Sequence, residues 1–157
     1  MENDIHFDFS NLKIAQLGFV YRDVRKQVKI MESFFGIPKF TILGPVEMEI
    51  IYRGRETKWS ALGAFGKLFN NIEIELIQYE SGECIHKEFL DEGREGLHHI
   101  RYDVDDIQAL IKKFKDEGIE VLQTGKIVNS TYAYMDTESI LGIILEFSTS
   151  TRGRNRI

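Results

Sequence analysis

Apolar and polar residues alternate most regularly along residues 72–77, where isoleucine or leucine occupies every second position. A period of two is typical of a β-strand, because successive side chains of a strand point to opposite faces. Residues 13–21 and 96–103 also read as strands, and each leads into a segment with helical spacing. The pattern therefore predicts a chain that mixes strands and helices, with a strand directly before each of its two main helices.

The two main helices are predicted from apolar residues spaced three and four positions apart. Asp23 precedes the first helix and Asp106 the second, and an aspartate there can accept hydrogen bonds from the first turn. Gly36 and Gly118 end the helices, and an isoleucine follows each of them. The apolar faces comprise Val24, Val28, Met31 and Phe35 in the first helix, and Ile107, Leu110, Ile111 and Phe114 in the second.

The same order of features occurs twice, which indicates an internal repeat. A polar residue of the first strand, Gln16 or His99, precedes the capping aspartate by seven positions in each half. Each half closes on a glutamate between apolar neighbours, Glu75 or Glu146. We predict an α+β fold of two tandem β-α-β-β-β units that form a curved mixed-sheet cleft. If the units pair about a pseudo-twofold axis, these four residues converge in the cleft.

The repeat also sets the expected boundaries. A short helix, capped by Ser81, is expected between the units, and residues 140–147 are expected to form the closing strand. The predicted parts are an N-terminal arm (1–11), a single domain (12–149) with a first unit (about 12–79), a linker helix (80–95) and a second unit (96–149), and a flexible tail (150–157).

The composition narrows the class of protein. A chain of 157 residues with 43% hydrophobic residues and 11 phenylalanines is expected to bury one substantial core. The net charge of −5 argues against nucleic-acid binding, which needs a basic face. The single cysteine cannot form an internal disulfide. No apolar run approaches membrane-spanning length and no leader opens the chain, so we expect a soluble, cytoplasmic protein without membrane or nucleic-acid partners.

The four repeated polar residues form a candidate metal site. Glu146 interrupts an apolar stretch, and a buried carboxylate must be paired or coordinated. Oxygen and nitrogen donors without a thiolate favour a catalytic divalent ion over structural zinc, and Zn, Ni, Co and Mn remain open. Arg101 shares a strand face with His99, where it can bind a substrate anion or pair with a carboxylate. His98 lies on the opposite face of this strand, with Ile100. We expect it to pack against the helix that follows the strand and not to affect metal binding.

The paired units and these four positions resemble the vicinal oxygen chelate superfamily, which includes glyoxalase I, methylmalonyl-CoA epimerases, extradiol dioxygenases and bleomycin-resistance proteins. The resemblance covers about residues 12–149. It is especially similar to methylmalonyl-CoA epimerases over Gly-Leu-His-His-Ile (96–100) and Val-Asp-Asp-Ile (104–107). The resemblance implies a metal site of Gln16, Glu75, His99 and Glu146, in which the second histidine of the pair is the ligand.

The resemblance implies a metal-dependent enzyme that moves a proton next to a carbonyl. We expect Glu146 to shuttle the proton and Glu75 to act as a second base. An epimerase-like isomerase acting on an acyl thioester is the preferred reading. The ligand set instead resembles glyoxalase I (lactoylglutathione lyase), which acts on a thiohemiacetal, and residues 58–68 lack the second catalytic glutamate of epimerases. A ligand-sequestering protein of the bleomycin-resistance kind is the non-enzymatic alternative.

A homodimer is expected from two features. Eight short strands in two curved units would leave sheet edges that need covering. The aromatic arm around Phe7 and Phe9 offers apolar surface to a second subunit. The resemblance implies the same assembly.

Overall fold

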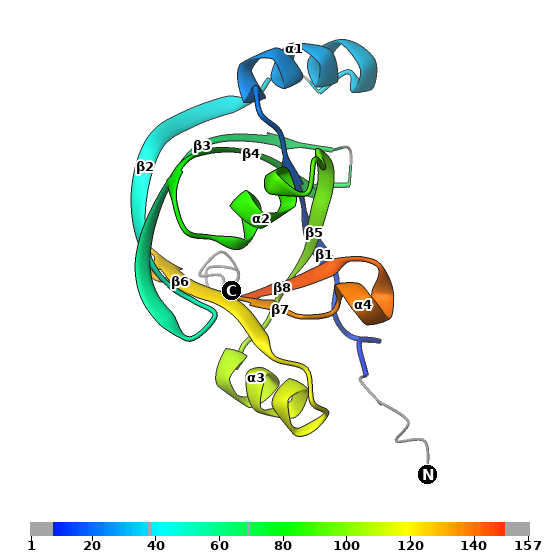
Figure 1. Ribbon diagram of the computed structural model, residues 1–157. Coiled ribbons are helices and arrows are strands. Elements are labelled where there is room, and N and C mark those ends of the chain that lie inside the picture. The colour runs from blue at the N-terminus through cyan, green and yellow to red at the C-terminus, as the bar shows by residue number, and fades with distance from the viewer. Residues whose placement is uncertain (1–7, 38, 69, 150–157) are drawn as a thin grey trace.

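The computed structural model describes residues 8–37, 39–68 and 70–149, which form eight strands and four helices (Figure 1). The predicted tail and the first seven residues of the predicted arm lie outside this part of the chain. The elements are β1 (Ile14–Val20), α1 (Val24–Phe35), β2 (Thr41–Tyr52), β3 (Arg55–Lys67), β4 (Glu73–Gly82), α2 (Ile85–Asp91), β5 (Gly96–Asp103), α3 (Ile107–Asp116), β6 (Val121–Ile127), β7 (Ser130–Met135), α4 (Glu138–Leu141) and β8 (Ile144–Ser148).

The strands form one closed barrel in the order β1-β4-β3-β2-β6-β7-β8-β5. Each unit uses the same internal order, first strand, fourth, third and second, and the first and fourth strands are parallel in both. The units join through two antiparallel pairings, β1 with β5 and β2 with β6. The prediction of two β-α-β-β-β units in a curved mixed sheet is confirmed. The expectation of open sheet edges is wrong, because every described strand has a neighbour on both sides.

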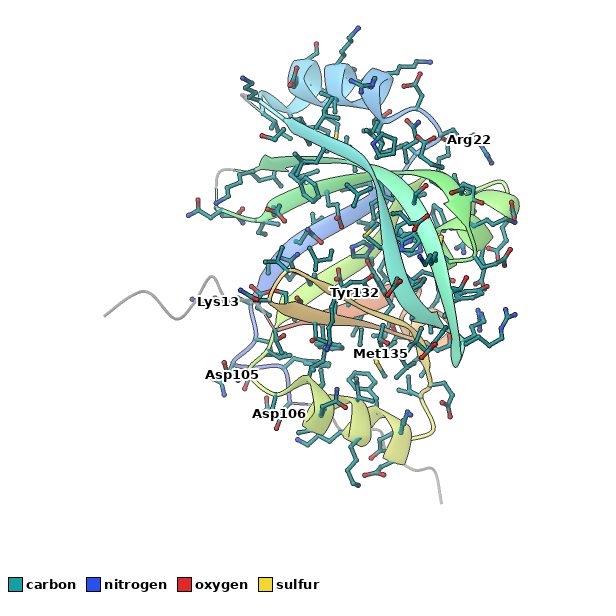
Figure 2. The ribbon with its side chains drawn as sticks, turned by 90° about the vertical axis from the view of Figure 1, so that its left-hand side faces the viewer. Lys13, Arg22, Asp105, Asp106, Tyr132 and Met135 are labelled. Carbon is teal, nitrogen blue, oxygen red and sulfur yellow. The ribbon has the colours of Figure 1, made fainter. Side chains whose placement is uncertain are left out.

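The helix limits follow the predicted capping residues. The Asp23 carboxylate accepts a hydrogen bond from the backbone N–H of Lys26 at 2.9 Å, and Gly36 ends α1 in the left-handed region (φ 62°). Asp106, which lies at the start of α3 in Figure 2, caps the N–H of Ala109 at 2.9 Å. The buried faces of these helices pack on the outside of their own units, α1 against β3 and β4 and α3 against β7.

Two predicted elements differ from the structure. Ser81 does not cap the linker helix, because β4 continues to Gly82 and Cys84 occupies the N-cap position. Residues 140–147 are not one strand, since the short helix α4 ends at Leu141 and β8 begins at Ile144. The Thr137 hydroxyl stabilises this turn, donating to the carbonyl of Ile143 at 2.8 Å and accepting from the N–H of Leu145 at 2.9 Å. Apolar content alone did not reveal this side-chain contact.

The linker helix α2 lies inside the ring of strands (Figure 1). Its buried residues Ile85, Phe89 and Leu90 belong to the core cluster that contains Val20 of β1 and Ile144 of β8. The helix therefore closes the barrel interior while connecting the two units. Among the described helices, none has the length and apolar character needed to cross a bilayer.

A homodimer stays a prediction, although the closed barrel removes one of its premises. Phe9 also stacks on Tyr102 and Phe147 of its own chain, at ring-centroid distances of 5.8 and 6.1 Å. Two sets of exposed apolar side chains can instead form the contact. They are Leu43, Val46 and Ile51 on β2, and Ile30, Phe34 and Phe35 on α1.

We predict that light scattering at micromolar concentration gives twice the chain mass. Val46→Asp and Phe34→Asp each place a charge in one of the two apolar sets, so the variant that dissociates identifies the interface. A monomeric wild-type chain would contradict the prediction.

Candidate metal centre

The four predicted ligands lie on neighbouring strands, in the order β4, β1, β5 and β8. Each unit thus contributes its first and last strand, as the repeat predicted. Register pairs Gly18 of β1 with both Glu75 and His99, while β5 and β8 pair through Arg101 and Glu146. The candidate ligand atoms of Glu75, His99 and Glu146 all lie within 4.8 Å of one another. The structure therefore brings three of the four residues to one point.

Gly18 makes room for the imidazole at this point. A β-carbon on Gly18 would lie 1.9 Å from Cε1 and 2.0 Å from Nε2 of His99. No real side chain tolerates such a contact, and the fully buried ring has no space to withdraw. The absence of a side chain at residue 18 is therefore a condition for the position of His99.

The donor atoms of the three side chains converge on one point, at ion-pair distances but without aligned hydrogen bonds. His99 Nε2 lies 3.1 Å from Glu146 Oε2 and 3.4 Å from Glu75 Oε2. His99 Nε2 and Glu146 Oε2 are nevertheless buried without an aligned hydrogen-bond partner among the described residues. Two ligands of one ion, each bound at about 2.0–2.2 Å, are separated by roughly 3.0–3.5 Å. The distances and the unpaired atoms therefore fit a metal ion between the three side chains.

Gln16 lies two residues before Gly18 on β1, opposite Glu73 of β4 and Arg101 of β5. Its amide nitrogen Nε2 donates to the Glu73 carboxylate at 2.7 Å, which fixes the orientation of the amide. The amide oxygen Oε1 is buried and has no partner in the described part of the chain. Gln16 thus holds a buried oxygen acceptor on β1, the strand between those of Glu75 and His99, and Glu73 orients its amide.

The charge around the centre is predominantly negative. Arg101 has Asp103 at 3.3 Å and Glu73 at 3.8 Å, and the carboxylates of Glu146 and Glu75 also act on its charge. One guanidinium therefore faces four carboxylates in a mostly buried region. This excess of negative charge favours a divalent cation. The role of Arg101 in binding a substrate anion stays a prediction, and nearby carboxylates already neutralise its charge.

The same carboxylates act on the imidazole. Burial lowers the pKa of His99, but contact with Glu146 and Glu75 raises it more, to about 9. In the metal-free protein His99 is therefore protonated near neutral pH. A metal ion must displace that proton, because only the neutral imidazole binds metal.

Aromatic and imidazole side chains line the interior beside this centre. Tyr134 lies 5.0 Å from the His99 ring, and Trp59 stacks on His86 of α2 at 4.6 Å between centroids. His86 and His98 are both buried. Neither histidine was expected from the sequence to lie in the barrel interior. The one available indication was that His86 lies beside Ile85 and three positions before Phe89, on the apolar face of the linker helix.

Cys84 is buried at the start of α2. Burial raises the pKa of its thiol to about 12. The thiolate form is therefore suppressed near neutral pH, and the side chain packs as a small apolar group.

Two paired β-α-β-β-β units that share one buried carboxylate–imidazole centre define an α+β protein of glyoxalase-like fold. The chain belongs to the Glyoxalase/Bleomycin resistance protein/Dioxygenase superfamily, whose family model matches residues 15–134. No curated protein matches the chain in sequence.

Solved structures share the fold at low sequence identity. A methylmalonyl-CoA epimerase from Mycobacterium tuberculosis is 14% identical, with a TM-score of 0.64 over 88% of this chain and 89% of that chain. A hypothetical protein from Bacillus halodurans is 20% identical, with a TM-score of 0.62 over 88% and 94%. A variant of the Streptomyces coelicolor methylmalonyl-CoA epimerase, in complex with 2-nitronate-propionyl-CoA, is 18% identical, with a TM-score of 0.56 over 88% and 94%. These likenesses show a shared fold.

We predict one tightly bound divalent ion per chain at this centre after purification without chelator. His99→Ala and Glu146→Ala should each abolish tight binding, because each removes a converging donor. Glu75→Ala and Gln16→Ala should weaken it. Metal analysis measures the number of ions per chain, and competitive titration with a chromophoric chelator measures the affinity. The matched control is Glu49→Ala, an exposed glutamate of β2, which should bind as the wild type does. Unchanged affinity in His99→Ala would refute the centre.

We predict that the metal-free protein loses stability as the pH rises from about 6.5 to about 9. The pKa of His99 is raised on folding from 6.5 to about 9, so its stabilising contribution is complete below 6.5 and disappears above 9. At about 1.4 kcal/mol per pH unit, the loss is at most about 3.5 kcal/mol. Denaturant unfolding of chelator-treated protein at several pH values measures it. His99→Gln should flatten this dependence, and an equally steep profile in that variant would contradict the assignment.

Proposed function

We propose that this protein is a metal-dependent enzyme that moves a proton on the carbon next to a carbonyl group. The observation that carries the proposal is the pair of carboxylates at His99. Glu146 of β8 and Glu75 of β4 lie 3.1 and 3.4 Å from the same imidazole nitrogen. Their strands lie on opposite sides of the β1–β5 pair in the barrel. Two bases can thus approach one substrate carbon from two directions.

The bound ion would supply Lewis-acid stabilisation of negative charge on the substrate carbonyl oxygen. The residues of the chain would do the proton chemistry. Glu146, with a side chain only 7% exposed, is assigned the abstraction of the proton, because a carboxylate held away from water is a stronger base. Glu75, 17% exposed, is assigned the second acid–base role. His99 and Gln16 would hold the ion and stay unprotonated at their ligand atoms.

We assign an acyl thioester as the preferred substrate class and an epimerase-like isomerisation as the reaction. The His98-His99 motif and the helical linker support this assignment, as does the shared fold with methylmalonyl-CoA epimerases. An epimerase needs an acid–base group on each face of the carbon. Neither β2 nor β3 supplies an interior carboxylate among the described residues, since Glu47 and Glu49 are exposed and pair with Lys58. In this proposal Glu75 takes that place.

A glyoxalase I-like lyase is the second candidate. The oxygen-rich set of Gln16, Glu75, His99 and Glu146 favours it, because this set resembles the ligands of glyoxalase I. A proton shift between neighbouring carbons of a thiohemiacetal can be carried by one glutamate, so Glu75 would then be only a ligand. The two candidates differ in the function of Glu75, which makes them separable by experiment.

The test is solvent-deuterium incorporation into a 2-methyl-branched acyl thioester, incubated with metal-loaded protein in deuterated water. Deuterium should enter the α-carbon in the wild type. Glu146→Gln should reduce exchange by about 10²–10⁴-fold, as expected for loss of a general base. Glu75→Gln should impair inversion more than exchange, because one face can still lose its proton. Glu49→Gln is the control and should retain both.

Other outcomes decide against this assignment. Turnover of a methylglyoxal thiohemiacetal without thioester exchange would favour the glyoxalase I-like reading. Tight binding of a carbonyl ligand with no turnover of either substrate would indicate a ligand-sequestering protein of the bleomycin-resistance kind. Exchange that survives Glu146→Gln would remove Glu146 from its proposed role.

A further inference from the structure

An irregularity in β5 places two consecutive histidines inside the barrel. Gly18 of β1 pairs with His99, but the next residue, Phe19, pairs with Leu97, so β5 has one extra residue at His98. Such a β-bulge interrupts the alternation that would otherwise send His98 and His99 to opposite faces. Both side chains are buried, at 2% and 0% exposure. The expectation that His98 packs on the helix side with Ile100 is wrong for this reason.

The bulge brings the Nδ1 atoms of the His98 and His99 rings into contact. The Nδ1 atoms of His98 and His99 are 3.0 Å apart in a hydrogen bond, with the ring planes nearly perpendicular. One nitrogen must donate and the other must accept. His99 faces Glu75 and Glu146 through Nε2, so Nε2 is the atom for an ion or a shared proton. An ion on Nε2 leaves the hydrogen of His99 on Nδ1, and the imidazolium that the two adjacent carboxylates favour in the metal-free protein also has hydrogen on Nδ1.

We propose that His98 is a positioning residue for the metal centre, which accepts the Nδ1–H of His99 and thereby holds the Nε2 lone pair toward the carboxylates. The inference rests on the proposed centre. A metal-binding histidine usually donates its second N–H to a carboxylate, a carbonyl or water. Here a neutral imidazole takes that place, and the described residues offer no other acceptor to His99 Nδ1. Gln16 is held in the same way, through its non-ligating nitrogen, by Glu73.

The imidazole of His86 lies close enough to His98 and His99 to raise the question of a second metal ion bound by the three histidines. Nitrogen atoms of His86, His98 and His99 lie within 4.8 Å of one another, and both ring nitrogens of His86 lack partners in the described residues. A second ion there would need the Nδ1 lone pair of His99 as well as a lone pair of His98. The hydrogen bond already uses both Nδ1 atoms. The geometry therefore favours one ion and a fixed tautomer over two ions.

Nitrogen-15 NMR of histidine-labelled protein tests the tautomers directly. His98 should show an unprotonated Nδ1 and a protonated Nε2, and His99 should show a protonated Nδ1, both without metal and with Zn²⁺ bound. The reverse assignment, with hydrogen on His98 Nδ1, overturns the proposal. This readout is independent of catalysis and of whether the ion binds.

Three substitutions of His98 separate positioning from packing. Asparagine places an acceptor oxygen near the position of Nδ1, whereas glutamine places its amide near Nε2 and leucine supplies no acceptor. His98→Gln and His98→Leu should weaken Zn²⁺ binding roughly 10–100-fold, the usual loss when a ligand's supporting partner is removed. His98→Asn should restore most of the affinity. Thermal unfolding of each variant shows whether the fold is retained.

Equal affinity in His98→Leu and the wild type would refute the positioning role. So would a stoichiometry of two Zn²⁺ per chain that falls to one in His86→Leu, because the His98 and His99 nitrogens would then bind metal. If the wild type binds no ion while NMR shows the expected tautomers, the proposed function fails and the hydrogen-bond assignment stands.

Discussion

The structure depends on a buried imidazole, His99, that lies between two carboxylates at ion-pair distance but without an aligned hydrogen bond to either. Gln16 Oε1, His99 Nε2 and Glu146 Oε2 are buried, and none has an aligned partner among the described residues. Each unsatisfied buried polar atom costs about 1–3 kcal/mol, and more where charge is involved. A fold retains such groups when a ligand satisfies them, and the bound ion would then stabilise the folded state. The residues that hold these atoms in place are therefore as important as the atoms themselves.

Most of these supporting residues come from strand geometry rather than from side-chain chemistry. Gly18 leaves the space that the His99 ring occupies, and the bulge at His98 turns a second imidazole toward the first. Glu73 lies opposite Gln16 in the register of β1 and β4, which allows the amide to donate to it. The linker helix α2 then fills the interior next to this centre, where the His86 ring lies 6.3 Å from the His99 ring. Barrel closure, strand register and the linker helix thus together determine where the side chains of the candidate centre lie.

These features explain which parts were predictable from the sequence. The aspartate caps, the terminal glycines of the helices and the repeated order of polar residues are local patterns. They were sufficient to predict the two units and the four strands that carry the candidate ligands. Register and bulges are set by pairing between distant strands, so the partner of each residue could not be read from alternation. His98 shows the consequence, because strict alternation assigned it to the wrong face. The same applies to His86, whose burial depends on where the linker helix lies, and to the closure of the sheet into a barrel.

The two units are alike in topology but not in their surroundings, and this asymmetry affects the proposed chemistry. Glu75 and Glu146 occupy equivalent last strands, yet the side chain of Glu75 is 17% exposed and that of Glu146 is 7% exposed. Glu146 lies in a strand with no exposed residue, whereas β4, the strand of Glu75, also contains exposed residues. On the proposed function, a proton on Glu75 would exchange with solvent faster than one on Glu146, and both would exchange. A symmetric duplication thus yields two carboxylates with different access to water, and on the proposed function this difference would let them perform distinct steps.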